Sequence, residues 1–126
     1  MADLVLVDTS ILFDFMADHD TADVFEQLLL DHKAALSIIT VYELFRGVEK
    51  SQHITQREEL IGLCKIVDLD LPIARKASEI YTHLKKSGLL IAHEDILIAA
   101  TALVLDYPLL SKNQKDYQKI SGLKLV

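Results

Sequence analysis

The chain has 126 residues and a formal net charge of −6, from 19 acidic and 13 basic side chains. Hydrophobic residues make up 51% and charged residues 25%, which excludes a disordered tail and a collagen-like repeat. The acidic balance also excludes a protein that holds nucleic acid by bulk positive charge, although it leaves room for an enzyme that binds metal cations.

The length is typical of one domain, and we expect residues 1–126 to form it around a core of its own. A single cysteine, Cys64, rules out an internal disulfide and favours a reducing compartment. The longest apolar stretch, residues 96–105, is too short for a bilayer span, and the first residues lack a signal-peptide pattern. We therefore expect a cytoplasmic protein without membrane contact.

Strand and helix patterns alternate along the chain, which predicts an α/β fold with a mostly parallel central sheet flanked by helices. Short apolar runs predict strands over residues 4–7, 35–39, 66–69 and 109–111, with an edge strand over 123–126. Helical spacing predicts helices over residues 11–16, 21–33, 55–64, 72–87 and 96–105, a helix from residue 40, and a short turn over 113–117. In the second of these helices, Val24 and Leu28 are expected on the inner face.

Two local signals set predicted helix boundaries. The Thr40-x-x-Glu43 spacing is that of a capping box, so we expect Thr40 to cap a helix with Glu43 in its first turn. Pro72 suits the first turn of the helix over 72–87, and Gly88 suits its C-terminal cap.

Four acidic residues stand at the ends of predicted elements. Asp8 closes the first strand, Glu43 follows the second, Asp95 opens the apolar helix, and Asp116 follows the strand over 109–111. Chemistry in parallel α/β sheets collects beyond the carboxyl ends of the strands, so these acids can converge there. Crowded carboxylates repel one another, and Mg²⁺ or Mn²⁺ relieves that repulsion through hard oxygen ligands.

Each acid also has a purely structural interpretation. Glu43 can cap its helix, Asp95 can favour its helix dipole, Asp8 can end its strand, and Asp116 can be one more solvated charge. Asp8 is the strongest candidate of the four, because a carboxylate directly after an apolar central strand lies deep in the edge of the sheet.

Five short motifs follow one another along the chain: VDTS at 7–10, YELFRG at 42–47, DILIAATA at 95–102, LSKNQKDY at 110–117 and ISGL at 120–123. In this order they resemble the PIN-domain ribonucleases, specifically the VapC-type toxins of prokaryotic toxin–antitoxin pairs. The resemblance implies a catalytic and metal-binding set of four residues, Asp8, Glu43, Asp95 and Asp116. It also implies substrate or supporting contacts from Ser10, Arg46, Ser111 and Asn113.

The motifs depart from the family pattern in three places. Ser111 stands where Thr is more common, and Tyr117 replaces the commoner Phe. His93 and Glu94 precede Asp95, so Glu94 competes with Asp95 as a metal ligand, and we favour Asp95 because it keeps the spacing of the motif.

Several basic residues keep more than one interpretation. Arg46 pairs with Glu43 across three residues of helix, contacts a phosphate or faces solvent. Three lysines lie in or next to the last two motifs, and they form either an RNA-contact patch or a solvated face: Lys112, Lys115 and Lys119.

By this resemblance, the chain is expected to be a Mg²⁺-dependent endoribonuclease, with Mn²⁺ as a substitute, that leaves 5′-phosphate and 3′-hydroxyl ends. Its expected partners are RNA, a second copy in a homodimer, and an antitoxin that fills the acidic groove. Two alternatives stay open: a receiver-like phosphoacceptor domain, and a PIN scaffold that binds RNA or a partner without cleavage. Thr40 disfavours the receiver, because it stands where the phosphorylated Asp belongs.

Overall fold

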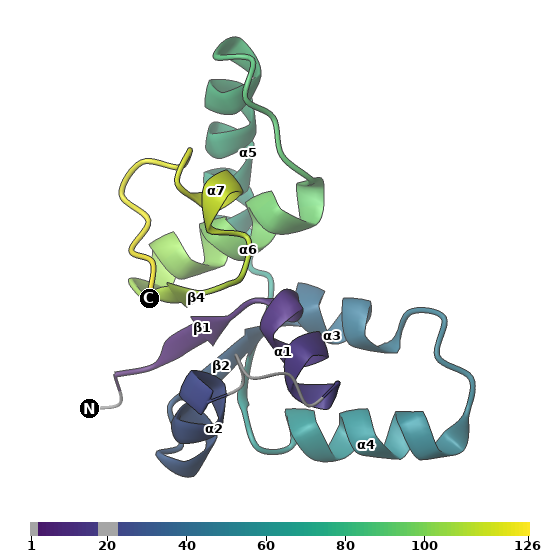
Figure 1. Cartoon of the computed structure of the whole chain (residues 1–126). Coiled ribbons are helices and arrows are strands. Elements are labelled where there is room, and N and C mark those ends of the chain that lie inside the picture. Colours follow the sequence, from purple (N-terminus) through teal and green to yellow (C-terminus); the bar gives the residue numbers. More distant parts are fainter. Residues whose placement is uncertain (1–2, 18–22) are drawn as a thin grey trace.

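A computed structural model describes residues 3–17 and 23–126. Within these ranges, four parallel strands form one sheet in the order β3-β2-β1-β4 (Figure 1). Their bounds are β1 Val5–Val7, β2 Ala34–Ser37, β3 Lys65–Val67 and β4 Leu109–Leu110. The predicted α/β fold with a parallel central sheet is confirmed.

Helices pack on both faces of this sheet (Figure 1). One group consists of α1 (Thr9–Met16), α2 (Asp23–Leu30), α3 (Ile38–Phe45) and α4 (Ser51–Ile61). The other consists of α5 (Leu71–Lys86), α6 (His93–Leu105) and α7 (Gln114–Tyr117). In the described part of the chain, none of these helices combines the length and apolar character needed to cross a membrane.

The central strand β1 supplies both hydrophobic cores. Leu6 belongs to the core with α5, α6 and α7, whereas Val7 belongs to the core with α1 to α4, and both side chains are fully buried. Successive side chains of a strand point to opposite faces, so an apolar run is what a strand covered on both sides requires. Because β1 is covered on both sides, Asp8, which directly follows it, is buried at the carboxyl end of the sheet.

The start of α3 differs from the prediction. Ser37, at the end of β2, caps the helix by accepting a hydrogen bond from the Ile39 N–H at 3.0 Å, so Thr40 is not the cap. Glu43 consequently lies in the second turn of the helix instead of the first. The β-branched pair Ile38-Ile39 reads locally as strand, but Ile39 packs against a core from the helix, and tertiary packing overrides local propensity.

Helix α2 also differs in its inner face and its end. Phe25 is fully buried and meets Phe15 edge-on, while Val24 is half exposed; Leu28 packs against the core as predicted. The helix ends at Leu30 because His32 adopts a left-handed backbone with φ +56°. Residues 21 and 22 of the predicted helix lie outside the described residues.

Other boundaries shift by a few residues. Helix α4 lies earlier than predicted, α6 begins at His93, and β3 ends at Val67. The predicted C-terminal edge strand is reduced to one parallel bridge between Leu109 and Leu125. The end of α5 is as expected, with Gly88 at φ +68° just after the cap residue, where glycine adopts a left-handed turn without strain.

Candidate active site

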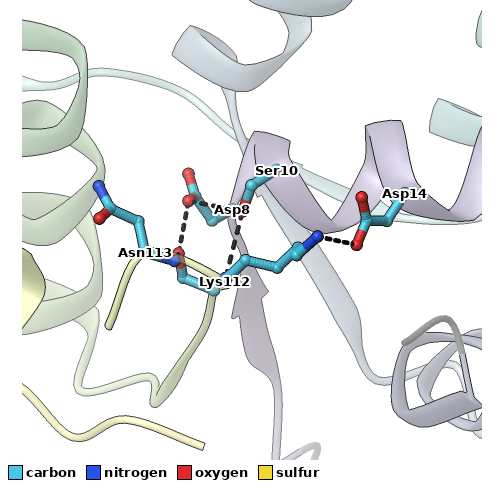
Figure 2. Close-up of polar contacts among 6 residues, drawn as sticks. Asp8, Ser10, Asp14, Lys112 and Asn113 are labelled. Carbon is cyan, nitrogen blue, oxygen red and sulfur yellow. Dashed lines mark hydrogen bonds and ion pairs between the residues drawn. The ribbon is translucent and has the colours of Figure 1, made fainter. Parts of the chain in front are cut away.

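Asp8 is the most buried and most extensively hydrogen-bonded of the four candidate acids. It follows β1 directly, is only 4% exposed, and caps α1 by accepting the Thr9 N–H at 2.9 Å. Its Oδ2 accepts two hydroxyls, from Ser10 at 3.1 Å and from Ser111 at 2.6 Å (Figure 2). Hydrogen bonds from two separate segments hold the carboxylate in one orientation, as a buried anion requires.

The loop between β4 and α7 is tied to this carboxylate. Ser111 Oγ, besides donating to Asp8, accepts the Asn113 N–H at 2.9 Å. The Lys112 N–H donates to Ser10 Oγ at 3.2 Å, and the Lys112 ammonium lies 2.6 Å from Asp14 on α1. Figure 2 shows Lys112 running along α1 between these two contacts. These two contacts bind the loop to α1 beside Asp8.

Glu43 reaches the site from α3. Its Oε1 accepts the Thr9 hydroxyl at 2.7 Å, and the hydroxyls of Thr9 and Thr40 lie 3.1 Å apart. Thr9 and Thr40 are buried, so this short chain of hydroxyls links α1 to α3 beneath the Glu43 carboxylate. Arg46, in turn, places its guanidinium carbon 5.4 Å from the centre of the Tyr42 ring, so it contacts this ring instead of pairing with Glu43.

Asp95 enters from the first turn of α6, and Tyr117 links it to Asp8. The buried Tyr117 hydroxyl lies 3.3 Å from Oδ1 of each carboxylate. Burial and the two neighbouring charges raise the pKa of Tyr117 above its usual range, so its hydroxyl stays a neutral donor. The motif alone did not predict this role for Tyr117, and its one signal was the hydroxyl that distinguishes Tyr from the commoner Phe at this position.

The acids affect one another electrostatically. The pKa of Asp95 is raised from 3.8 to about 6, first by burial and then by the charge of Asp8, with smaller contributions from Glu43 and Asp116. The hydrogen bond from Tyr117 works in the opposite direction. Without a bound cation, keeping all of these carboxylates ionised therefore lowers the free energy of unfolding.

We expect Asp95→Asn to stabilise the metal-free chain at neutral pH. Since the pKa of Asp95 is raised in the folded state, its penalty is present when the carboxyl is ionised, above about pH 6, and disappears as the pH falls toward 4. After allowance for solvent screening at this half-buried position, the gain is about 1 to 2 kcal/mol. Thermal unfolding in EDTA at pH 7.5 and at pH 4 measures it, and an equal effect at both pH values would contradict the electrostatic cause.

These side chains surround one open pocket of about 240 Å³. It is lined by three carboxylates (Asp8, Glu43, Asp95), three polar residues (Thr9, Ser10, Asn113) and one aromatic residue (Phe13). Among the described residues, no three His, Cys, Asp or Glu side chains are placed so that they could hold one metal ion together. The donor set is open and rich in oxygen, which fits Mg²⁺, an ion that binds through one or two carboxylates and keeps several waters.

Asp116 is oriented differently from the other three acids. It accepts hydrogen bonds from Asn113 Nδ2 at 3.1 Å and from Lys119 Nζ at 3.2 Å, and these bonds lower the pKa of Asp116. Its charge still contributes to the raised pKa of Asp95. Asp116 thus stands beside the pocket, whereas Asp8, Glu43 and Asp95 line it.

The remaining candidates fall outside the lining. Glu94 is half-buried in the first turn of α6, and its neighbour His93 stacks on Tyr81 with ring centres 5.6 Å apart. Of the three lysines considered as an RNA-contact patch, Lys112 pairs with Asp14 and Lys119 with Asp116, while Lys115 is exposed.

The sequence of this chain is similar to those of proteins of known family. The PIN domain family model matches residues 5–123. Ribonuclease VapC1 of Methanocaldococcus jannaschii is 36% identical over 127 positions, which cover 96% of this chain and 85% of the relative. Ribonuclease VapC2 of Haemophilus influenzae is 33% identical over 96 positions, which cover 73% of each chain.

Solved structures share the fold. DNA-bound VapBC from Salmonella typhimurium has a TM-score of 0.87 at 23% identity, covering 100% of this chain and 98% of that one. VapBC-1 from nontypeable Haemophilus influenzae has a TM-score of 0.83 at 27% identity, covering 98% and 96%. With the family model, these matches exclude the receiver domain considered from sequence. The chain belongs to the PIN-domain family, among its VapC ribonuclease toxins.

Proposed function

We propose that this VapC-type chain is an endoribonuclease that hydrolyses RNA phosphodiester bonds at the acidic pocket with the help of a divalent cation. One observation carries the proposal: carboxylates from the end of β1, from α3 and from α6 converge on one open pocket, where burial and then the charge of Asp8 raise the pKa of Asp95. Relatives named Ribonuclease VapC support the activity.

The roles of the side chains follow from their contacts. Asp8, Glu43 and Asp95 would hold Mg²⁺, or Mn²⁺ in its place, because they are the carboxylates that line the pocket. The bound ion would supply an activated water and neutralise charge on the leaving 3′-oxygen. Ser10 and Ser111 orient Asp8 through its Oδ2.

Three other residues would assist the carboxylates that line the pocket (Asp8, Glu43 and Asp95, the pocket acids) without binding the ion as they do. Asn113 lines the pocket and holds Asp116, so it connects the fourth acid to the site. Asp116 adds negative charge beside Asp95 and is the fourth metal-site candidate. Arg46 is exposed on the C-terminal side of α3, where it can meet a substrate phosphate.

Incubation of the purified chain with a mixed RNA pool tests the proposal. We expect cleavage with Mg²⁺ or Mn²⁺, no cleavage in EDTA, and products with 5′-phosphate and 3′-hydroxyl ends. Cleavage that persists in EDTA would contradict the role of the ion. Binding of RNA without cleavage in any of these ions would favour the non-catalytic scaffold instead.

The pocket also indicates how an antitoxin would inhibit the enzyme. Structures similar to this chain include a toxin–antitoxin complex from Klebsiella pneumoniae. We infer that the cognate antitoxin places an Arg or Lys against Asp8, Glu43 and Asp95, because a cation in that place replaces the charge of the metal ion. The expected result is weaker Mn²⁺ binding in the complex, measured by calorimetry on the chain alone and on its complex with the cognate antitoxin. Unchanged Mn²⁺ affinity would point to inhibition at a distant apolar face. The homodimer stays a prediction.

A further inference from the structure

Phe13 occupies an unusual place for a large apolar side chain. It lies in α1, lines the acidic pocket and is 45% exposed. Its neighbours Ile11 and Leu12 are buried, and Phe15 packs edge-on against Phe25 with ring centres 5.1 Å apart. The core therefore takes the other large residues of this helix and leaves the Phe13 ring at the pocket.

The chemistry of the carboxylates does not explain this ring. A phenyl group binds no metal ion, donates no hydrogen bond to Asp8, and presents a face with partial negative charge. A solitary exposed Phe needs no explanation on an ordinary surface. Here the ring shares one pocket with three carboxylates, so whatever enters the pocket to reach them meets the ring as well.

A nucleic acid substrate needs a contact of this kind. The pocket is lined by three carboxylates on a chain of net charge −6, so bulk electrostatics oppose the approach of a phosphate backbone. One divalent cation would offset two of the three carboxylate charges and leave the pocket negative. Stacking of a base on an aromatic ring supplies affinity without any charge, and it accepts every base because each has a π face.

The surroundings of the ring are held in place. Ser10 and Asp14, three residues before and one residue after Phe13 on α1, are both bound by Lys112, through its N–H at 3.2 Å and its ammonium at 2.6 Å (Figure 2). These two contacts fix the loop between β4 and α7 against the part of α1 that carries the ring. A surface that is ordered before binding loses less entropy when a ligand arrives.

We propose that Phe13 is a substrate-binding residue, on which a base of single-stranded RNA next to the scissile phosphate stacks. The proposal rests on the function proposed above and deepens it, because it assigns a nucleotide subsite to the apolar wall of the acidic pocket. A subsite that works by stacking accepts every base, and the larger rings of purines give them the larger contact, so we expect a modest preference for adenine over uracil.

Three variants at this position separate stacking from plain hydrophobic contact. Phe13→Leu keeps an apolar side chain without a π face, Phe13→Ala removes the contact, and Phe13→Trp enlarges the ring. Leu30→Ala, at an exposed position on α2, is the matched control. The probes are short single-stranded oligoadenylate and oligouridylate RNAs in Mg²⁺, with KM and kcat measured separately and the melting temperature as a check of folding.

We expect Phe13→Leu and Phe13→Ala to raise KM for oligoadenylate roughly five-fold or more with kcat little changed, and to reduce the preference for adenine over uracil. Phe13→Trp should retain wild-type KM, and Leu30→Ala should behave as wild type. An unchanged KM in Phe13→Leu, with wild-type cleavage intact, would overturn the subsite and leave the ribonuclease standing. If that variant instead lost only binding to the cognate antitoxin, the ring would serve the antitoxin, and the RNA subsite would again be wrong. Absence of cleavage by the wild type itself would count against the ribonuclease.

Discussion

Replacement of Asp8 by Asn is expected to reduce Mg²⁺-dependent RNA cleavage roughly 100-fold or more, while the chain remains folded. The amide keeps the shape of the side chain and can still accept the Thr9 N–H that caps α1. It loses the negative charge, and one of its two acceptor oxygens becomes a donor facing the hydroxyls of Ser10 and Ser111. Those hydroxyls can reverse direction and accept, so we expect the fold to tolerate this change and the proposed metal site to lose its function.

Asp106→Asn is the matched control for this experiment. Asp106 has an 82% exposed side chain, caps α6 in a left-handed conformation that Asn also tolerates, and pairs with Lys124 at the surface. This variant loses the same unit of charge far from any pocket acid, so its cleavage rate should match the wild type. Circular dichroism and melting curves establish that both variants are folded. Full activity in folded Asp8→Asn would refute the assignment of Asp8 to the metal site.

Divalent ions are expected to stabilise the folded chain. Burial raises the pKa of Asp95 most, and the charges of Asp8, Glu43 and Asp116 raise it further, so these carboxylates repel one another and a bound cation would relieve that repulsion. An ion that binds only the folded state, at ten times its Kd, adds about 1.4 kcal/mol, or roughly 4 to 6 °C in Tm for a domain of this length. Melting curves in EDTA and in rising Mg²⁺ or Mn²⁺ measure the shift.

Two double variants decide whether this stabilisation comes from the pocket. Asp8→Asn/Asp95→Asn should melt at a higher temperature than the wild type in EDTA and respond little to the ions. Asp31→Asn/Asp106→Asn removes the same amount of charge from two exposed positions and should keep the wild-type response. Equal shifts in both double variants would mean that the ions act nonspecifically on the acidic surface. This readout does not depend on RNA cleavage.

The helix and strand types were predictable from the sequence because they depend on local patterns. A run of four apolar residues before Asp8 requires cover on both sides, and alternation of such runs with helical spacing is enough for a parallel α/β sheet. Boundaries were less certain, since they depend on which of several capable residues caps a helix. Ser37 and Thr40 both suit a cap, and the packing of Ile39 decided for Ser37.

The acids of the site could also be predicted from the sequence, because Asp8, Glu43 and Asp95 follow or begin recognisable elements. Their orientation was not. Tyr117 lies 109 positions from Asp8 along the chain, yet its hydroxyl stands between the carboxylates of Asp8 and Asp95. Asp116 looks equivalent to the other acids in sequence, and only its contacts with Asn113 and Lys119 distinguish it.

By itself, then, the sequence determined the fold class, the order of the motifs and the acids that they carry, because periodicity and motif spacing are properties of neighbouring residues. The tertiary structure alone decided which hydroxyls hold Asp8, that Thr9 joins Glu43 to α1, and that the Phe13 ring lines the acidic pocket. These contacts join segments 34 to 103 residues apart or depend on which face of a helix the core leaves uncovered. They follow from the register of the sheet and the packing of both cores, which no local pattern encodes.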